Sequence, residues 1–159
     1  MKKTKLLYWG IAVLMLIAMP TFATDGGVTD PSDLNYINGV KSDYMERITN
    51  EGNFTMIFDD IQLVQAGSPY TFPLSIGDGD YEIWGIGGSR ISDLNVKVYD
   101  KHGDLTEYGD LVAEDSQAGN NPVVRFSAKG CTAYSVQVEG NGFEPGFSEG
   151  YFLVIVLKD

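Results

Sequence analysis

The sequence predicts an all-β fold, a two-sheet β-sandwich or jelly roll with a short N-terminal helix. Seven to nine short β-rich runs recur between residue 53 and the C-terminus, and glycine-containing turns separate them. One segment ahead of these runs has the apolar spacing of an amphipathic helix. Neither an internal repeat nor a low-complexity tract interrupts the pattern, so we expect one sandwich domain over residues 53–159.

Residues 1–23 have the layout of a secretory signal peptide. Three lysines among the first five residues precede an apolar run over 6–19, and Thr21-Phe22-Ala23 supplies small residues before the expected cleavage site. A membrane anchor is the alternative, but the run is shorter than the roughly 20 residues of a span, and Pro20 ends it. We therefore expect an exported protein, periplasmic or extracellular, with no membrane span after cleavage.

Charge restricts the class of partner. Three of the 11 basic residues lie in the signal peptide, so eight remain against 22 acidic residues, and the formal net charge of −11 becomes −14. An acidic surface of this size repels phosphate backbones and anionic lipid headgroups. Nucleic acid is therefore excluded as the expected partner, and a protein or a polysaccharide remains.

The segment 24–52 is predicted to be a flexible leader followed by a helix. Ser32 or Asp33 is a suitable N-cap, and Gly52 lies where a helix commonly ends. Between them, apolar residues form one stripe at spacings of three and four: Leu34, Ile37, Val40, Tyr44 and Ile48.

The first predicted strands lie between residues 54 and 86. Two β-rich runs, 54–58 and 61–64, flank Asp59-Asp60, which marks a bulge or a turn. The run 70–74 contains Pro73, which lacks a backbone donor, so we expect an edge strand there. In the run 81–86, strand alternation points Trp84 away from the face that Tyr81 and Ile83 share.

The later strands complete the pattern. Alternating apolar residues predict a strand over 94–99, a turn over 100–103, and a return that begins at Asp104 and Leu105. Further strands are predicted at 123–126 and 134–139. The final run, 151–157, is apolar at consecutive positions, which predicts a strand covered on both faces, or a central strand beneath the helix.

Residues 66–158 resemble the bacterial pre-peptidase C-terminal domain, most closely the small secreted forms that stand alone. The resemblance rests on six patterned segments: Ala66-Gly67 with Tyr70-Thr71-Phe72, 93–100 with Gly103, 112–116, 122–126, 134–138 and 150–154. It implies a jelly-roll-like sandwich that is non-catalytic and assists secretion, solubility or substrate attachment of an accompanying enzyme. Asn95 stands where the family pattern prefers aspartate.

Reactive side chains are too few for nucleophilic or zinc catalysis. His102 is the only histidine and sits in a predicted turn, whereas a nucleophile needs a base that a third group orients. Cys131 is the only cysteine, so no intrachain disulfide forms, and we interpret it as a small buried apolar residue, with pairing between chains as the alternative. A hydrolase using two of the many carboxylates is a further alternative.

A calcium site is the sharpest site hypothesis. Calcium takes six to eight oxygen ligands, which loops often supply. Asp78 and Asp80 flank a flexible glycine at one loop, while Asp93 and Asn95 open the strand after the next loop. Both pairs are placed at the same end of the sandwich in this hypothesis. The alternative is that these residues only form turns.

Loop aromatics are the candidate ligand surface. Phe143 and Phe147 lie in a predicted loop over 140–150, where they either face a ligand or fold back onto the sandwich end. The sequence therefore predicts a non-catalytic exported β-sandwich that acts as a binding or accessory module. A calcium-stabilised adhesion or matrix-binding module is the first alternative, and a small two-carboxylate hydrolase is the second.

Overall fold

The computed structural model describes residues 31–100, 109–130 and 132–159. Within them, one helix precedes eight strands: α1 (Pro31–Glu51), β1 (Thr55–Gln65), β2 (Tyr70–Ile76), β3 (Gly79–Gly87), β4 (Ile91–Asp100), β5 (Leu111–Asp115), β6 (Val123–Ala128), β7 (Thr132–Phe143) and β8 (Glu149–Lys158). The predicted signal peptide and leader, His102, the return at 104–105 and Cys131 lie outside the described residues.

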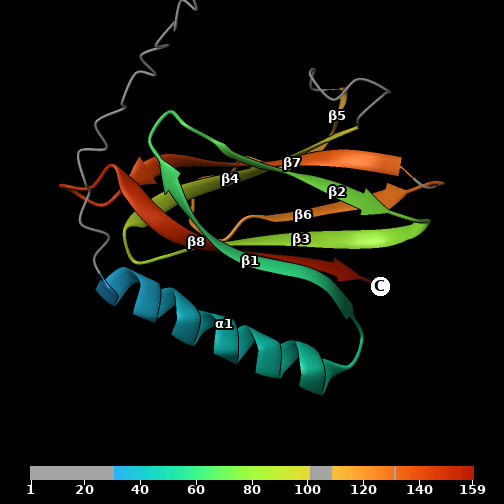
Figure 1. The fold of residues 1–159 in the computed structure, drawn as a ribbon, viewed down its shortest axis with the longest axis horizontal. Helices are drawn as coiled ribbons and strands as arrows, with labels where there is room; N and C mark the ends of the chain where they lie inside the picture. The colour runs from blue at the N-terminus through green and yellow to red at the C-terminus, as the bar shows by residue number, and fades with distance from the viewer. Residues whose placement is uncertain (1–30, 101–108, 131) are drawn as a thin grey trace, which may run out of the picture.

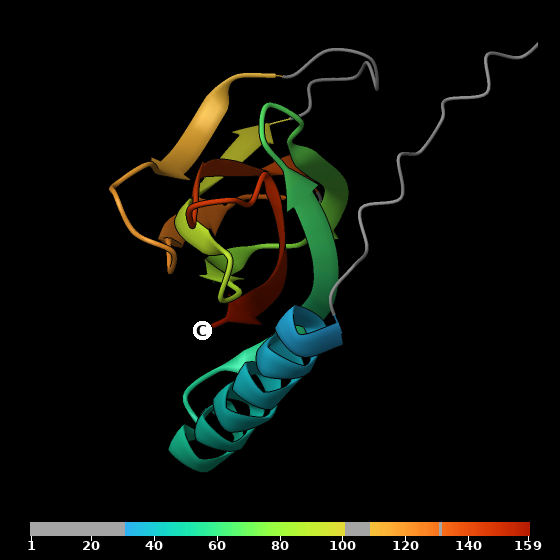
Figure 2. The same cartoon turned by 90° about the vertical axis from the view of Figure 1, so that its left-hand side faces the viewer.

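The strands form two antiparallel sheets, which confirms the predicted sandwich. Sheet A has the order β1-β8-β3-β6, and sheet B has the order β2-β7-β4-β5. Figure 1 shows three layers, with sheet B above sheet A and α1 beneath it. Figure 2, turned by 90°, shows α1 at the outer side of the sandwich.

Helix α1 forms where the sequence predicts it and packs its apolar stripe on sheet A. Ile37 and Ile48 are buried there, with Leu34, Val40 and Tyr44 partly buried beside them. The helix ends at Gly52, whose φ of 67° favours glycine and lets its N–H donate to the Ile48 carbonyl at 3.2 Å. Packing of this stripe, rather than helix propensity alone, holds α1 in place.

Strand β8 is central in sheet A, between β1 and β3, and lies beneath α1, as its unbroken apolar run predicts. Alternate side chains face opposite layers. Phe152, Val154 and Val156 belong to the core between the sheets. Leu153, Ile155 and Leu157 belong to the core under the helix. Because both faces of β8 are covered, neither set of positions needs a polar residue.

One boundary in β1 differs from the sequence prediction. The break expected at Asp59-Asp60 is wrong, because both residues continue β1 and pair with Ile155 and Val154 of β8. The irregularity lies earlier, between Met56 and Phe58. Pairing with a fully buried neighbour keeps the strand continuous through two acidic residues. The edge position expected for Pro73 is confirmed, since β2 is the terminal strand of sheet B.

A buried carboxylate joins the start of α1 to the sandwich. Asp33 is only 1% exposed; its Oδ1 accepts from the Ser89 hydroxyl at 2.7 Å, and its Oδ2 accepts from the Tyr151 N–H at 2.9 Å. Gly88 lies against this contact, and a Cβ there would come within 2.6 Å of the Tyr151 carbonyl oxygen. Glycine is therefore needed for the close approach, and Asp33 fixes the position at which the helix begins.

Substituting Asp33→Ala should lower the free energy of unfolding by about 2 kcal/mol, because a buried N–H and hydroxyl lose a charged acceptor. Urea unfolding of the variant measures this loss. The matched control is Asp43→Ala, at an exposed position on the same helix, which should change stability by less than about 0.5 kcal/mol. Equal losses in the two variants would contradict a specific role for the Asp33 contact.

Candidate functional site

The candidate site is a strip of side chains on the outer face of sheet A, beside α1. The register of β3 with β6 sets three cross-strand pairs: Asp80 with Ser127, Glu82 with Arg125, and Trp84 with Val123. We call these six residues the β3–β6 strip. Their neighbours in sequence, including Tyr81, Ile83, Val124 and Phe126, belong to the core between the sheets. Strand alternation therefore directs the strip outward.

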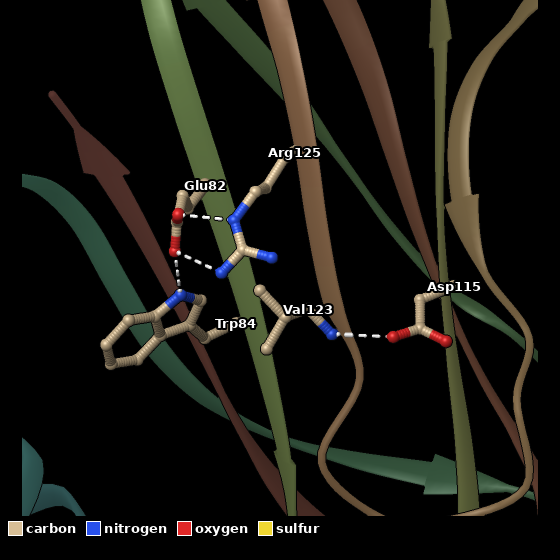
Figure 3. Close-up of polar contacts among 5 residues, drawn as sticks. All are labelled: Glu82, Trp84, Asp115, Val123 and Arg125. Atoms are coloured by element: carbon tan, nitrogen blue, oxygen red, sulfur yellow. Dashed lines mark hydrogen bonds and ion pairs between the residues drawn. The ribbon is translucent and has the colours of Figure 1, made fainter.

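Glu82 organises the centre of the strip. Its Oε1 accepts from Arg125 Nε at 2.5 Å, and its Oε2 accepts from Arg125 Nη2 at 3.4 Å and from Trp84 Nε1 at 2.7 Å (Figure 3). Glu82 is 8% exposed, while the side chain of Arg125 is 69% exposed. The hydrogen bond to Glu82, followed by its negative charge, raises the pKa of Arg125 above its ordinary value. The pair therefore presents a guanidinium that is fixed in place yet open to solvent.

An apolar hollow lies at the Trp84 end of the strip, between α1 and the start of β6. Its volume is about 190 Å³, and its lining is Tyr44, Arg47, Trp84, Gly85, Ile86, Asn121 and Val123. Tyr44 meets Trp84 edge to face, with ring centroids 5.7 Å apart. These contacts hold the indole as part of the wall of the hollow.

A second hollow, of about 280 Å³, lies at the opposite end of the strip. Its lining is Asp80, Tyr81, Glu82, Arg125, Phe126, Ser127 and Asp159. The carboxylate of Asp80 accepts a hydrogen bond from the Ser127 hydroxyl. Three acidic side chains and one arginine make this hollow the polar end of the strip. The strip thus runs from an apolar hollow, past the fixed guanidinium, to an acidic hollow.

Asp115 of β5 fixes the start of β6. Its Oδ2 accepts from the Val123 N–H at 2.9 Å (Figure 3). Its Oδ1 accepts from the Gln117 N–H at 3.1 Å. Since β5 belongs to sheet B and β6 to sheet A, this carboxylate ties the edges of the two sheets together. The position of Val123 beside the apolar hollow depends on this contact.

The four residues of the calcium hypothesis do not come together. Asp78 accepts from the Gly130 N–H, and Asp80 pairs with Ser127, at the end of the sandwich where β3 begins and β6 ends. Asp93 accepts from the Gly119 N–H at 3.2 Å at the other end, because β3 carries the chain across the sandwich before β4 begins. The expected placement of both pairs at one end is therefore wrong.

Asn95 differs from the other three residues of that hypothesis. It is 5% exposed, and its Oδ1 has no hydrogen-bond partner among the described residues. Its neighbours Leu94 and Val96 belong to the core between the sheets, so Asn95 faces the outer side of sheet B. In the part of the chain that the structure describes, no group of three or more His, Cys, Asp or Glu side chains is placed to hold a metal ion.

The two loop phenylalanines have different environments. Phe143 is wrongly assigned to a loop, because β7 continues to this residue and pairs it with Ile91 of β4. Its ring is partly buried against the core between the sheets, as expected if it folds back onto the sandwich end. Phe147 remains in the loop, is 45% exposed, and lies under the Arg90 guanidinium, 4.5 Å from the ring centroid.

Sequence reasoning did not identify the centre of the site. The i and i+2 spacing of Glu82 and Trp84 predicts that they share a face, but their partner Arg125 lies 43 residues away. Only the pairing register of β3 with β6 brings Arg125 opposite Glu82. The sequence did contain one signal, because Glu82 lies within an apolar strand. A buried glutamate requires a cationic or hydrogen-bonding partner.

Comparison with known proteins yields a likeness of fold. No family model and no curated protein matches the chain. Among solved structures, the chain is similar to the pre-peptidase C-terminal domain of collagenase from Bacillus anthracis, with 16% identity and a TM-score of 0.41 over 62% of this chain and 87% of that one. A second match, the structure of infectious bursal disease virus Gx strain, has 16% identity and a TM-score of 0.29 over 67% of this chain and 32% of that one.

The domain that the sequence resembles is thus among the matching structures, and at 16% identity the likeness concerns the fold alone. Within the described residues, none of the helical structure has the length and apolar character of a membrane span.

Substituting Glu82→Ala should lower the free energy of unfolding by about 1 kcal/mol, since the exposed guanidinium of Arg125 is well screened by water. The indole N–H loses its acceptor as well, so the emission of Trp84 should shift to longer wavelength. Trp84 is the only tryptophan in residues 24–159, which makes the signal specific.

The matched control is Glu139→Ala, which removes the acceptor of Lys97 Nζ, 2.7 Å away on sheet B. This variant should leave the Trp84 emission unchanged. An emission shift of equal size in both variants would contradict the local role of Glu82.

Thermal unfolding in millimolar calcium and in EDTA tests the metal hypothesis. Because the predicted ligands lie at two ends of the sandwich, we expect matching curves. Saturating calcium at 100 times its dissociation constant would instead add about 2.7 kcal/mol and raise the midpoint by several degrees. A rise that magnesium does not reproduce and that Asp93→Ala abolishes would contradict our expectation and place a site near Asp93 and Asn95.

Proposed function

We propose that the protein is a non-catalytic exported binding or accessory module that holds a polymeric ligand on the β3–β6 strip. The observation that carries the proposal is Arg125, whose side chain is 69% exposed and whose guanidinium Glu82 fixes between two hollows. A fixed, solvated cation is a ready partner for a ligand, because its side-chain entropy is largely lost before binding.

Helix α1 supports the choice of this face. Its apolar residues cover β8 and Trp84, and the strip continues beyond them along β3 and β6. The other outer face, on sheet B, contains the cross-strand pair of Lys97 with Glu139, where side-chain exposure is only 23% and 25%. Of these two cross-strand ion pairs, only the one on the strip has a strongly exposed cation.

The acidic groups of the strip favour binding over hydrolysis. A two-carboxylate hydrolase needs one acid free to donate a proton and another free to act as base or nucleophile. Both oxygens of Glu82 are held by Arg125 and Trp84, and Asp80 is bonded to Ser127. The sequence resemblance to a non-catalytic accessory domain agrees with this proposal, and the signal peptide predicted at residues 1–23 supports a location outside the cytoplasm.

A paired binding experiment tests the proposal. The protein without its predicted signal peptide, residues 24–159, is screened against immobilised polysaccharides and against a random heptapeptide library displayed on phage. Any ligand found is then titrated against Arg125→Gln and Lys97→Gln, which each remove one cation from a cross-strand ion pair. We expect Arg125→Gln to weaken binding about tenfold and Lys97→Gln to leave it unchanged.

Equal effects of the two substitutions, or no ligand in either screen, would contradict the proposed site. Hydrolysis of a bound ligand that Glu82→Gln abolishes would contradict the non-catalytic role and favour the two-carboxylate alternative.

A further inference from the structure

Strand β6 is an open edge of sheet A. It is the terminal strand of the order β1-β8-β3-β6, and among the described residues it pairs with β3 alone. Gly85 N–H donates to the Pro122 carbonyl at 2.9 Å, and Gly87 N–H donates to the Asn120 carbonyl at 2.7 Å. Because the register continues with Ile83 opposite Val124, the even-numbered residues of β6 direct their backbone groups toward β3.

The odd-numbered residues therefore direct their backbone groups away from the sheet. The N–H of Val123 donates to Asp115, so this donor is not open to an added strand. Beyond it, the N–H and C=O groups of Arg125 and Ser127 have no hydrogen-bond partner among the described residues. Unpaired backbone groups in a row form a template for one more strand.

The edge of sheet B at β2 offers a contrast. Strand β2 carries Pro73, which cannot donate to an added strand. Strand β6 has no proline between Val123 and Ala128. The edge of sheet A at β6 is thus better suited to strand addition than the edge at β2.

The β3–β6 strip favours particular side chains on a strand added to β6, which we call the guest strand. On an antiparallel guest, the residues opposite Ser127 and Arg125 place their side chains on the outer face of sheet A, next to the strip. Asp80 and Asp159 line the same hollow as Ser127, which favours a basic residue there. Arg125 favours an acidic residue. Two positions further along, the guest passes the apolar hollow of Tyr44 and Trp84, which favours an apolar residue.

We propose that β6 binds an extended segment of a partner protein as a fifth, antiparallel strand of sheet A. The segment carries a basic, an acidic and an apolar residue at alternate positions, read from its N-terminus. This inference rests on the proposed function, because it names the class of ligand that the same strip holds. The inference has two independent requirements. Strand pairing uses the backbone groups of Arg125 and Ser127, and selection of the peptide sequence uses the charged side chains of the strip and the apolar hollow.

Selection from the random heptapeptide phage library, on residues 24–159, is the first test. Retained peptides are counter-selected on the variant Ser127→Pro, which removes an outward N–H but no bond to β3. We expect enriched peptides with the basic–acidic–apolar order at alternate positions, and at least a tenfold loss of their binding to Ser127→Pro. Thermal unfolding checks that the variant keeps its fold.

A matched pair of synthetic peptides tests strand pairing without any change to the protein. In acetyl-Thr-Lys-Thr-Glu-Thr-Leu-Thr-amide, the Glu N–H faces β6, whereas the N–H of the threonine that precedes the Glu faces away. N-methylation of the Glu should abolish binding, while N-methylation of the threonine that precedes it should preserve it. Amide hydrogen exchange should show new protection at Arg125 and Ser127 on binding of the parent peptide.

Several outcomes would overturn the inference. If the library gives no peptide whose binding depends on Ser127, or if both N-methylated peptides bind equally, strand addition is wrong. If the variant Arg125→Val self-associates and the wild type binds no peptide, the role of Arg125 is to prevent edge-to-edge pairing of two copies, and strand addition is wrong. A polysaccharide whose binding needs Arg125 would overturn strand addition and leave the proposed function standing, whereas absence of any ligand that depends on Arg125 would remove both.

Discussion

Burial of β8 on both faces is the constraint on which the rest of the structure depends. One set of its side chains needs sheet B as cover, and the other set needs a second layer on the opposite side. Helix α1 supplies that layer, which is why an otherwise all-β protein has a helix packed across one sheet (Figure 1). Without α1, Leu153, Ile155 and Leu157 would face water, at a cost of roughly 1.5–3 kcal/mol each.

The position of α1 in turn defines the candidate site. Asp33 anchors its first turn to Ser89 and Tyr151, and its apolar stripe covers β8 and Trp84. The β3–β6 strip lies beside the helix, where its charged and polar side chains extend the outer face of sheet A. The apolar hollow forms at the boundary, because Tyr44 of the helix meets Trp84 of the sheet there. The candidate site and the stability of the fold thus share one helix, and Tyr44 contributes to both.

Sequence patterns predicted the parts of the fold that depend on local spacing. The helix over 32–50, the edge position of Pro73 and the central position of the 151–157 run agree with the structure. The break at Asp59-Asp60 and the loop position of Phe143 do not, because ladder pairing with β8 and β4 extends those strands past residues that disfavour them. The expected meeting of Asp78 and Asp80 with Asp93 failed for a related reason, since nearness in sequence says nothing of the sandwich end at which a strand starts.

By itself, the sequence determined the class of fold, the helix and the two-sided burial of its last strand, because each depends on the periodicity of apolar residues along a short segment. It also determined the acidic charge, through composition alone. Only the tertiary structure decided that Glu82 meets Arg125, that Asp115 closes the edge at Val123, and that β6 ends sheet A. These contacts join residues that the chain separates by up to 43 positions or place strands by sheet order. Register and sheet order are set by the packing of whole layers, which no local pattern encodes.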